Sequence, residues 1–124
     1  RKNGFEFENL ASFFQNISAV IPNEAPSLLH GDLWNGNYLV SAKGGPVLID
    51  PAVAYAPREL DLAMMQLFGG FPQEVFSVYH EIFPLTNNWK ARIPLFQLYY
   101  LLVHLNIFGV GYLPQVKAVL KLYT

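Results

Sequence analysis

The segment with the clearest chemical content is an eight-residue stretch that contains a histidine, an acid and two amides. It reads His30-Gly31-Asp32-Leu33-Trp34-Asn35-Gly36-Asn37. Asp32 offers a carboxylate that can take a proton from an attacking hydroxyl, and Asn37 offers an amide oxygen that can bind a metal ion. Phosphoryl transfer needs both functions, one at the acceptor and one at the metal that bridges the phosphates. The spacing therefore favours phosphoryl transfer, although either residue alone could be a turn former or a turn cap.

A further candidate ligand is Asp50, which follows the apolar run Val47–Ile49. That run and Tyr38–Val40 have the composition of strands, and the turn sequence Lys43–Pro46 between them predicts a hairpin. Asn37 precedes the first strand and Asp50 follows the second, so a hairpin would bring both to the same end. Two hard oxygen ligands that converge there suit Mg²⁺, which also takes water and phosphate oxygens. Taken alone, Asp50 could simply end a strand.

This arrangement matches the catalytic-loop pattern of protein kinases, which is His, any residue, Asp, Leu, three residues, Asn. In those enzymes an Asp after the next hairpin strand binds Mg²⁺. The Phe-Gly that follows this Asp in protein kinases is replaced here by Pro51-Ala52. We expect His30 to hold the loop by a hydrogen bond rather than to exchange protons. His80 and His104 have no carboxylate or Cys at ligand spacing, and both are interpreted as structural.

The elements that must position these groups are mostly helical. Apolar spacing and proline positions predict helices over Phe5–Val20, Arg58–Phe68, Pro72–Phe83, Trp89–Phe108 and Tyr112–Tyr123. Ile21–Pro26 is predicted to be a loop because it holds two prolines. The fold class is therefore α+β and mostly helical, with one short catalytic hairpin followed by about four helices.

Composition excludes several classes of function. The 124 residues are 52% hydrophobic and 14% charged, with a net charge of −1 and no cysteine. No basic stripe is present for nucleic acid, and no signal peptide is visible. Ile93–Leu113 is about as long as a membrane span, but its proline, glycines and polar residues favour a buried helix in a soluble core. We therefore expect no nucleic-acid or membrane partner and a reducing, cytoplasmic location.

Four segments resemble consecutive signatures of fructosamine/ketosamine kinases, a family with an aminoglycoside-phosphotransferase-like, protein-kinase-like fold. The segments are Leu28–Asn37, Pro46–Ala52, Arg58–Met64 and Leu67–Phe71. The Trp after Asp-Leu and the Phe-Gly-Gly-Phe run point to this family rather than to aminoglycoside or choline kinases. The run Tyr99–Gly111 also resembles the family's C-terminal helix.

The resemblance implies ATP- and Mg²⁺-dependent phosphorylation of a sugar hydroxyl on a ketosamine small molecule or a glycated lysine, as in protein deglycation. It implies that Asp32 is the catalytic base and that Asn37 and Asp50 bind the metal and the nucleotide. Asp61 would be a structural anchor near the catalytic loop, with a solvated helix residue as the alternative reading. Trp34 and Tyr55 would lie in the vicinity of the substrate.

One departure from the family affects the substrate assignment. Ala56-Pro57 stands where the resemblance leads us to expect Gly-His, in a loop that lies near the sugar site in such folds. Another small-molecule kinase, acting on an aminoglycoside, choline or a thiosugar, therefore stays open. So do a non-catalytic, pseudokinase-like module and a membrane or purely structural helical domain.

The resemblance also implies how the chain is organised. Residues 1–124 would form part of a C-terminal catalytic lobe: helix and loop over 1–26, catalytic loop, hairpin and metal loop over 27–57, and a helical subdomain over 58–124. The Gly-rich loop that covers ATP and the Lys that pairs its phosphates are not found here. They are expected in an N-terminal lobe outside this chain. We therefore expect these residues alone to be inactive, and to self-associate through an exposed lobe interface.

Overall fold

The computed structural model describes Phe7 and residues 9–124. The chain divides into two compact units, one made of the residues up to Asn23 together with Pro94–Thr124, the other of Glu24–Ile93. Most of the predicted Phe5–Val20 helix is present as α1 (Leu10–Val20), while Phe5, Glu6 and Glu8 lie outside the described residues.

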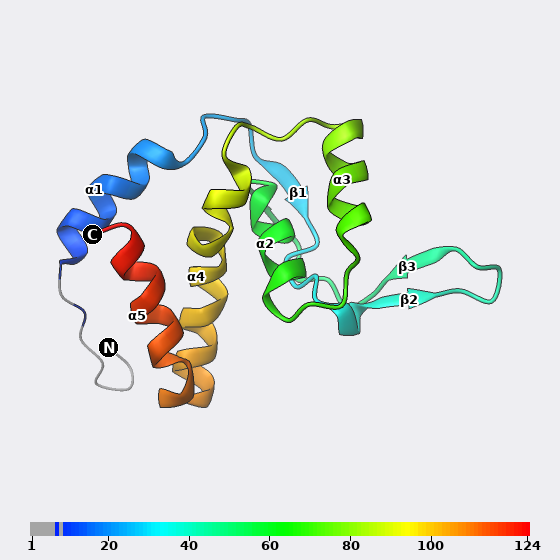
Figure 1. The fold of residues 1–124 in the computed structure, drawn as a ribbon. Coiled ribbons are helices and arrows are strands. Elements are labelled where there is room, and N and C mark those ends of the chain that lie inside the picture. Colours follow the sequence, from blue (N-terminus) through cyan, green and yellow to red (C-terminus); the bar gives the residue numbers. More distant parts are fainter. Residues whose placement is uncertain (1–6, 8) are drawn as a thin grey trace. The chain divides into compact units, whose positions relative to one another are not determined.

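The Glu24–Ile93 unit carries all the strands that the described residues form (Figure 1). In chain order its elements are β1 (Ser27–Leu29), the 3₁₀ turn η1 (Asn35–Asn37), β2 (Tyr38–Val40), β3 (Pro46–Leu48), β4 (Ala54–Ala56), α2 (Glu59–Leu67), α3 (Gln73–Ile82) and the start of α4 (Trp89–Phe108). The strands form two separate antiparallel pairs, β1 with β4 and β2 with β3.

The β2–β3 pair is the hairpin that the sequence predicts. Tyr38 faces Leu48, and Leu39 faces Val47. Its turn is closed by hydrogen bonds from the Ser41 amide to the Gly45 carbonyl at 2.8 Å and from the Gly44 amide to the Ser41 carbonyl at 2.9 Å. The hairpin projects away from α2 and α3 in Figure 1, and apolar side chains along both strands are exposed.

Helices α2 and α3 contribute buried apolar side chains to the core of this unit. Four consecutive residues of α2, Leu62 to Met65, are buried, and so is Phe76 of α3. Pro72 caps the N-terminus of α3 with φ −64°, so the predicted helix start at this proline is confirmed. The hairpin followed by four helices, α2 to α5, confirms the predicted α+β class.

The other unit contains α1, the part of α4 from Pro94 onward, the 3₁₀ turn η2 (Val110–Tyr112) and α5 (Leu113–Leu122). The end of α5 is joined to α1, because the Asn16 side chain donates to the Tyr123 carbonyl at 2.6 Å and the Phe13 and Tyr123 rings meet edge to face. Within the described residues, no helix has the length and apolar character to cross a membrane.

Candidate active site

The predicted catalytic loop, residues 30–37, connects β1 to β2 and lies against the segment that follows β3. The His30 carbonyl accepts a hydrogen bond from the Ala52 amide at 2.7 Å. Gly31 has φ +88°, and a Cβ added there would lie 1.8 Å from the Ala52 carbonyl oxygen. Only glycine allows the two segments to approach this closely with this backbone conformation. The β1–β4 pairing continues into this contact, since Leu29 faces Ala54.

Asp61, in the first turn of α2, holds the start of this loop. Its two carboxylate oxygens accept hydrogen bonds from consecutive backbone amides, His30 at 2.8 Å and Gly31 at 3.0 Å. A carboxylate that accepts two amide N–H groups forms charge-assisted bonds, which are stronger than neutral ones. Asp61 therefore makes the contacts that an anchor of the loop requires.

His30 connects the loop to the residue before Asp50. Its Nε2 atom lies 2.8 Å from the Ile49 carbonyl oxygen, and its Nδ1 atom accepts the Asp32 amide at 3.2 Å. A neutral ring with its hydrogen on Nε2 satisfies both contacts, since that atom donates and Nδ1 accepts. Both ring nitrogens are thus engaged in holding backbone, as the predicted supporting role requires.

Asn37 is buried, with 6% of its surface exposed, and it is bound directly to Asp32. Its side-chain nitrogen donates to the Asp32 carbonyl oxygen at 2.8 Å and approaches Asp32 Oδ2 at 3.4 Å. Because the amide nitrogen is used in this way, the amide oxygen is the atom left to bind a metal ion.

The hairpin brings Asn37 and Asp50 to the same end, as the sequence predicts. The Asn37 carbonyl accepts the Ile49 amide at 3.0 Å, which continues the β2–β3 pairing by one residue. Asp50 then turns away with φ +50°, a left-handed conformation that is uncommon for residues other than glycine. Such conformations concentrate at functional sites. The structure thus places the three predicted residues, Asp32, Asn37 and Asp50, around one end of the hairpin.

The donor set of this site suits a magnesium ion that is shared with phosphates. Within Phe7 and residues 9–124, no group of three or more His, Cys, Asp or Glu side chains could hold a metal ion by itself. One carboxylate and one amide oxygen leave several positions of an octahedral Mg²⁺ for water and phosphate oxygens. The residues present therefore fit a nucleotide-bound Mg²⁺ better than a self-contained metal centre.

The turn between α2 and α3 packs against the second half of the catalytic loop, which the sequence did not reveal. The Trp34 and Phe68 rings meet edge to face with centroids 6.5 Å apart. Gly70 has φ +93°, and a Cβ there would lie 2.5 Å from the Asn35 side chain. The Phe-Gly-Gly-Phe run is thus more than a link between helices, because it supports Trp34 and Asn35. An amphipathic pattern could not show this, since the contact depends on glycine.

The two residues expected near the substrate are both exposed. Trp34 is 42% exposed, and its ring lies over Gly36 within the loop. Tyr55 is 74% exposed and lies on β4 opposite Leu28. Trp34 is therefore placed beside the predicted base by the loop itself, whereas Tyr55 is placed on a strand that pairs with the residues preceding the loop.

A largely apolar cavity of about 610 Å³ lies in the same unit, between β1, the hairpin, α2 and α3. Its lining includes Leu29, Leu33, Leu62 and Met65, with Asp61 at its wall. Asp32, Asn37 and Asp50 do not line it. The cavity therefore adjoins the catalytic loop at Leu33 and at its anchor Asp61, and none of the three residues predicted to bind the metal or act as the base lines it.

The family model described as fructosamine kinase matches residues 1–124. The chain belongs to the fructosamine kinase family. A probable ketoamine kinase of Enterococcus faecium is 56% identical over 106 residues, which cover 85% of this chain and 38% of that protein. A probable ketoamine kinase of Thermus thermophilus is 48% identical over 93 residues, covering 75% of this chain and 35% of that protein.

Solved structures of this family have the same fold. One from Thermobifida fusca, provisionally named a fructosamine-3-kinase, matches with a TM-score of 0.81 and 38% identity, over 94% of this chain and 42% of that one. A second from Haemophilus somnus, named in the same way, gives 0.82 and 29% identity, over 97% and 42%. The chain thus spans about two fifths of the length of these relatives. Its α+β, mostly helical architecture is that of the C-terminal lobe of the family's kinase-like fold.

Proposed function

We propose that this chain supplies the catalytic base and the metal ligands of an ATP-dependent ketosamine kinase. The observation that carries the proposal is the junction of Asp32, Asn37 and Asp50 at one end of the hairpin, with the loop held by Asp61. Membership in the fructosamine kinase family and the names of the relatives support the substrate class. The same family supports ATP as the phosphoryl donor.

In the proposed reaction, a hydroxyl oxygen of the sugar attacks the γ-phosphorus of ATP. The bond between that phosphorus and the β–γ bridging oxygen breaks, which gives ADP and a sugar phosphate monoester. The Asp32 carboxylate orients the hydroxyl and takes its proton. Mg²⁺, when bound, would neutralise charge on the phosphates, and the Asn37 amide oxygen and the Asp50 carboxylate would hold it.

Each of these groups is held by bonds that do not involve substrate. Asp32 is fixed by its backbone contacts to His30 and Asn37, and Asn37 is buried. Preorganised groups need not be reoriented during the reaction, which is the main contribution a protein makes to phosphoryl transfer. Exposed Trp34 beside this base offers an apolar face on which the acceptor could be bound, and Tyr55 is the second candidate for that role.

The decisive experiment measures ADP release by the complete gene product with Mg·ATP and a panel of acceptors. Fructosyl-lysine should be phosphorylated, and Asp32→Ala should abolish most of the turnover. Equal or faster turnover of an aminoglycoside, choline or a thiosugar would favour another small-molecule kinase, for which the Ala56-Pro57 departure is the motivating observation. Binding of ATP without transfer to any acceptor would favour a non-catalytic module. Deglycation of proteins and a cytoplasmic location are part of the same proposal.

The division of the chain into residues 1–26, 27–57 and 58–124 of one catalytic lobe is proposed with it. The remaining length of the relatives, about three fifths, is where we propose that the Gly-rich loop and the phosphate-pairing Lys lie. The exposed apolar side chains of β2 and β3 are the surface that we propose for self-association of the isolated chain.

A further inference from the structure

We propose that the buried ion pair between Glu59 and Arg92 positions the catalytic loop, by fixing the first turn of α2 and with it the Asp61 carboxylate. The effect of this pair on turnover rests on the proposed kinase function. Its effect on the position of the catalytic loop does not depend on that function, and the two effects can be measured separately.

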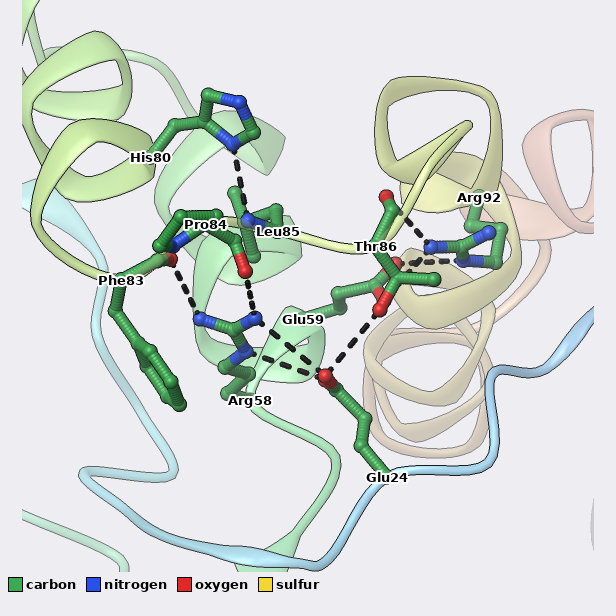
Figure 2. A network of polar contacts seen from close by, with 9 residues as sticks. All are labelled: Glu24, Arg58, Glu59, His80, Phe83, Pro84, Leu85, Thr86 and Arg92. Atoms are coloured by element: carbon green, nitrogen blue, oxygen red, sulfur yellow. Dashed lines mark hydrogen bonds and ion pairs between the residues drawn. The ribbon is translucent and has the colours of Figure 1, made fainter.

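The pair is bidentate (Figure 2), and both residues are buried. Arg92 Nε lies 2.8 Å from Glu59 Oε1, and Arg92 Nη2 lies 3.0 Å from Glu59 Oε2. Glu59 is 0% exposed and Arg92 6%. The guanidinium also donates to the Asn87 carbonyl at 2.7 Å and to the Thr86 carbonyl at 3.2 Å. Planar, doubly bonded geometry of this kind fixes direction as well as distance.

Stability alone is a weak reason for a protein to keep such a pair. Removing two charges from water costs about as much as their attraction returns, and apolar residues of similar volume often stabilise a fold equally well. This buried ion pair joins the first turn of α2 to the first turn of α4. We therefore infer that its role is to fix the position of α2 relative to the start of α4. Glu59 is the first residue of α2, and Arg92 lies in the first turn of α4.

Helix α2 links this ion pair to the catalytic loop, because Glu59 lies two residues before Asp61. Glu59 and Asp61 are two positions apart on α2, which is about 200° around the helix axis, so their side chains leave opposite sides of one turn. On one side Glu59 is held by Arg92. On the other, Asp61 holds the His30 and Gly31 amides at 2.8 and 3.0 Å. A shift of the turn by about 0.5 Å would lengthen these bonds to the limit of useful hydrogen bonding.

A second ion pair beside the first provides a matched control. Arg58 Nε lies 3.2 Å from Glu24 Oε1, with Glu24 24% exposed. Arg58 precedes α2 and mainly holds the Phe83 and Pro84 carbonyls, at 2.8 and 2.6 Å (Figure 2). The Glu24–Arg58 contact is longer and more exposed to water than the Glu59–Arg92 contact. Removing the charge of Glu24 should therefore change the position of α2 less. Glu24 also accepts the Thr86 hydroxyl at 3.2 Å, and a glutamine keeps a side-chain oxygen for that bond. Glu24→Gln thus removes the charge of the second ion pair and leaves the Glu59–Arg92 bonds in place.

The test compares Glu59→Gln, the double variant Glu59→Leu/Arg92→Met and the control Glu24→Gln, all in the complete gene product. The first readout is hydrogen exchange at the His30 and Gly31 amides, relative to amides in α5. We expect both test variants to exchange these amides about tenfold faster than the parent, and the control to match the parent. The double variant, with apolar residues of similar volume, should keep a Tm close to that of the parent. Should Glu59→Gln fail to fold because it leaves the Arg92 charge buried and unpaired, the double variant alone decides.

The second readout is steady-state kinetics with Mg·ATP and fructosyl-lysine. We expect kcat to fall about tenfold in the test variants, with both KM values within about twofold of the parent, because only the alignment of the base changes. Exchange rates equal to those of the control would overturn the inference whatever the activity. Faster exchange with unchanged kcat would overturn the catalytic part. Faster exchange in a protein that phosphorylates nothing would uphold the positioning and reject the proposed function.

Discussion

Replacing Asp61 by asparagine tests the anchor of the catalytic loop with almost no change of shape. The carboxylate accepts one hydrogen bond at each oxygen, from the His30 and Gly31 amides at 2.8 and 3.0 Å. An asparagine has only one acceptor oxygen, so its NH₂ group must face one of the two amides, donor against donor. One charge-assisted bond is lost, the other becomes neutral, and one backbone amide of the half-buried loop loses its carboxylate acceptor.

The loss of stability caused by Asp61→Asn can be worked out from these changes in hydrogen bonding. Hydrogen bonds to charged groups contribute about 1.5–3 kcal/mol, and an unsatisfied amide costs about 1–3 kcal/mol more when it is buried. Because the loop is partly accessible to water, we expect Asp61→Asn to lower the free energy of unfolding by about 2–3 kcal/mol. A value of 2 kcal/mol corresponds to about a thirtyfold larger population of molecules with the loop released, since about 1.4 kcal/mol is a factor of ten.

The assay combines urea unfolding of the complete gene product with kcat and KM for Mg·ATP and fructosyl-lysine. We expect a loss of about 2–3 kcal/mol in the free energy of unfolding and a fall in kcat of at least tenfold. Glu74→Gln is the matched control, because Glu74 is the exposed acid in the first turn of α3 and also interacts with a helix dipole. If Asp61→Asn and Glu74→Gln lose the same stability and keep the same kcat, the anchor argument is wrong.

Four further outcomes test the site and the chain. Asp32→Ala should lower turnover by about a hundredfold or more and leave nucleotide affinity nearly intact; activity within a few-fold of the parent would reject Asp32 as the base. Asp50→Asn should raise the Mg²⁺ concentration needed for activity and collapse turnover, so an unchanged Mg²⁺ dependence would exclude it as a ligand. Gly31→Ala should unfold or displace the loop, since its Cβ would meet the Ala52 carbonyl at 1.8 Å, and a melting temperature equal to that of the parent would show that the loop yields easily. The 124 residues alone should bind ATP weakly, transfer nothing and self-associate, which calorimetry and sedimentation would check; micromolar binding or any transfer would contradict this.

The sequence predicts the helices and the hairpin well because each has a local signal. α4 begins at Trp89 and ends at Phe108 as expected, and β2 coincides with Tyr38–Val40. The β1–β4 pair was missed for an equally physical reason. Ala54–Ala56 is three residues long, has no apolar alternation and directly precedes a proline, so its strand conformation depends on Ser27–Leu29, which lie far away in the sequence.

The positions of the candidate site residues could be predicted to the extent that they follow from hairpin geometry. Asn37 and Asp50 flank the two strands, so antiparallel pairing alone brings them together. The support of the loop by Phe68 and Gly70, and the enclosure of Glu59, could not be predicted in this way. A glutamate in the first turn of a helix is usually solvated, and only its contact with Arg92, 33 residues away, distinguishes this one.

Arg58, Glu59 and Asp61 show how one helical turn can connect three separate segments. Burial lowers the pKa of Arg58, but hydrogen bonds and electrostatic attraction from Glu24 and Tyr79 outweigh it and raise the pKa above the usual arginine value. The guanidinium, which is charged at neutral pH like any arginine, donates to the Phe83 and Pro84 carbonyls. Glu59 binds Arg92, and Asp61 binds the catalytic loop. Each side chain leaves the turn in a different direction and holds a different segment, and Glu59 acts on the catalytic loop only by fixing the turn that carries Asp61. A double-mutant cycle should therefore find strong coupling between Glu59 and Arg92 and weak coupling between Glu24 and Asp61.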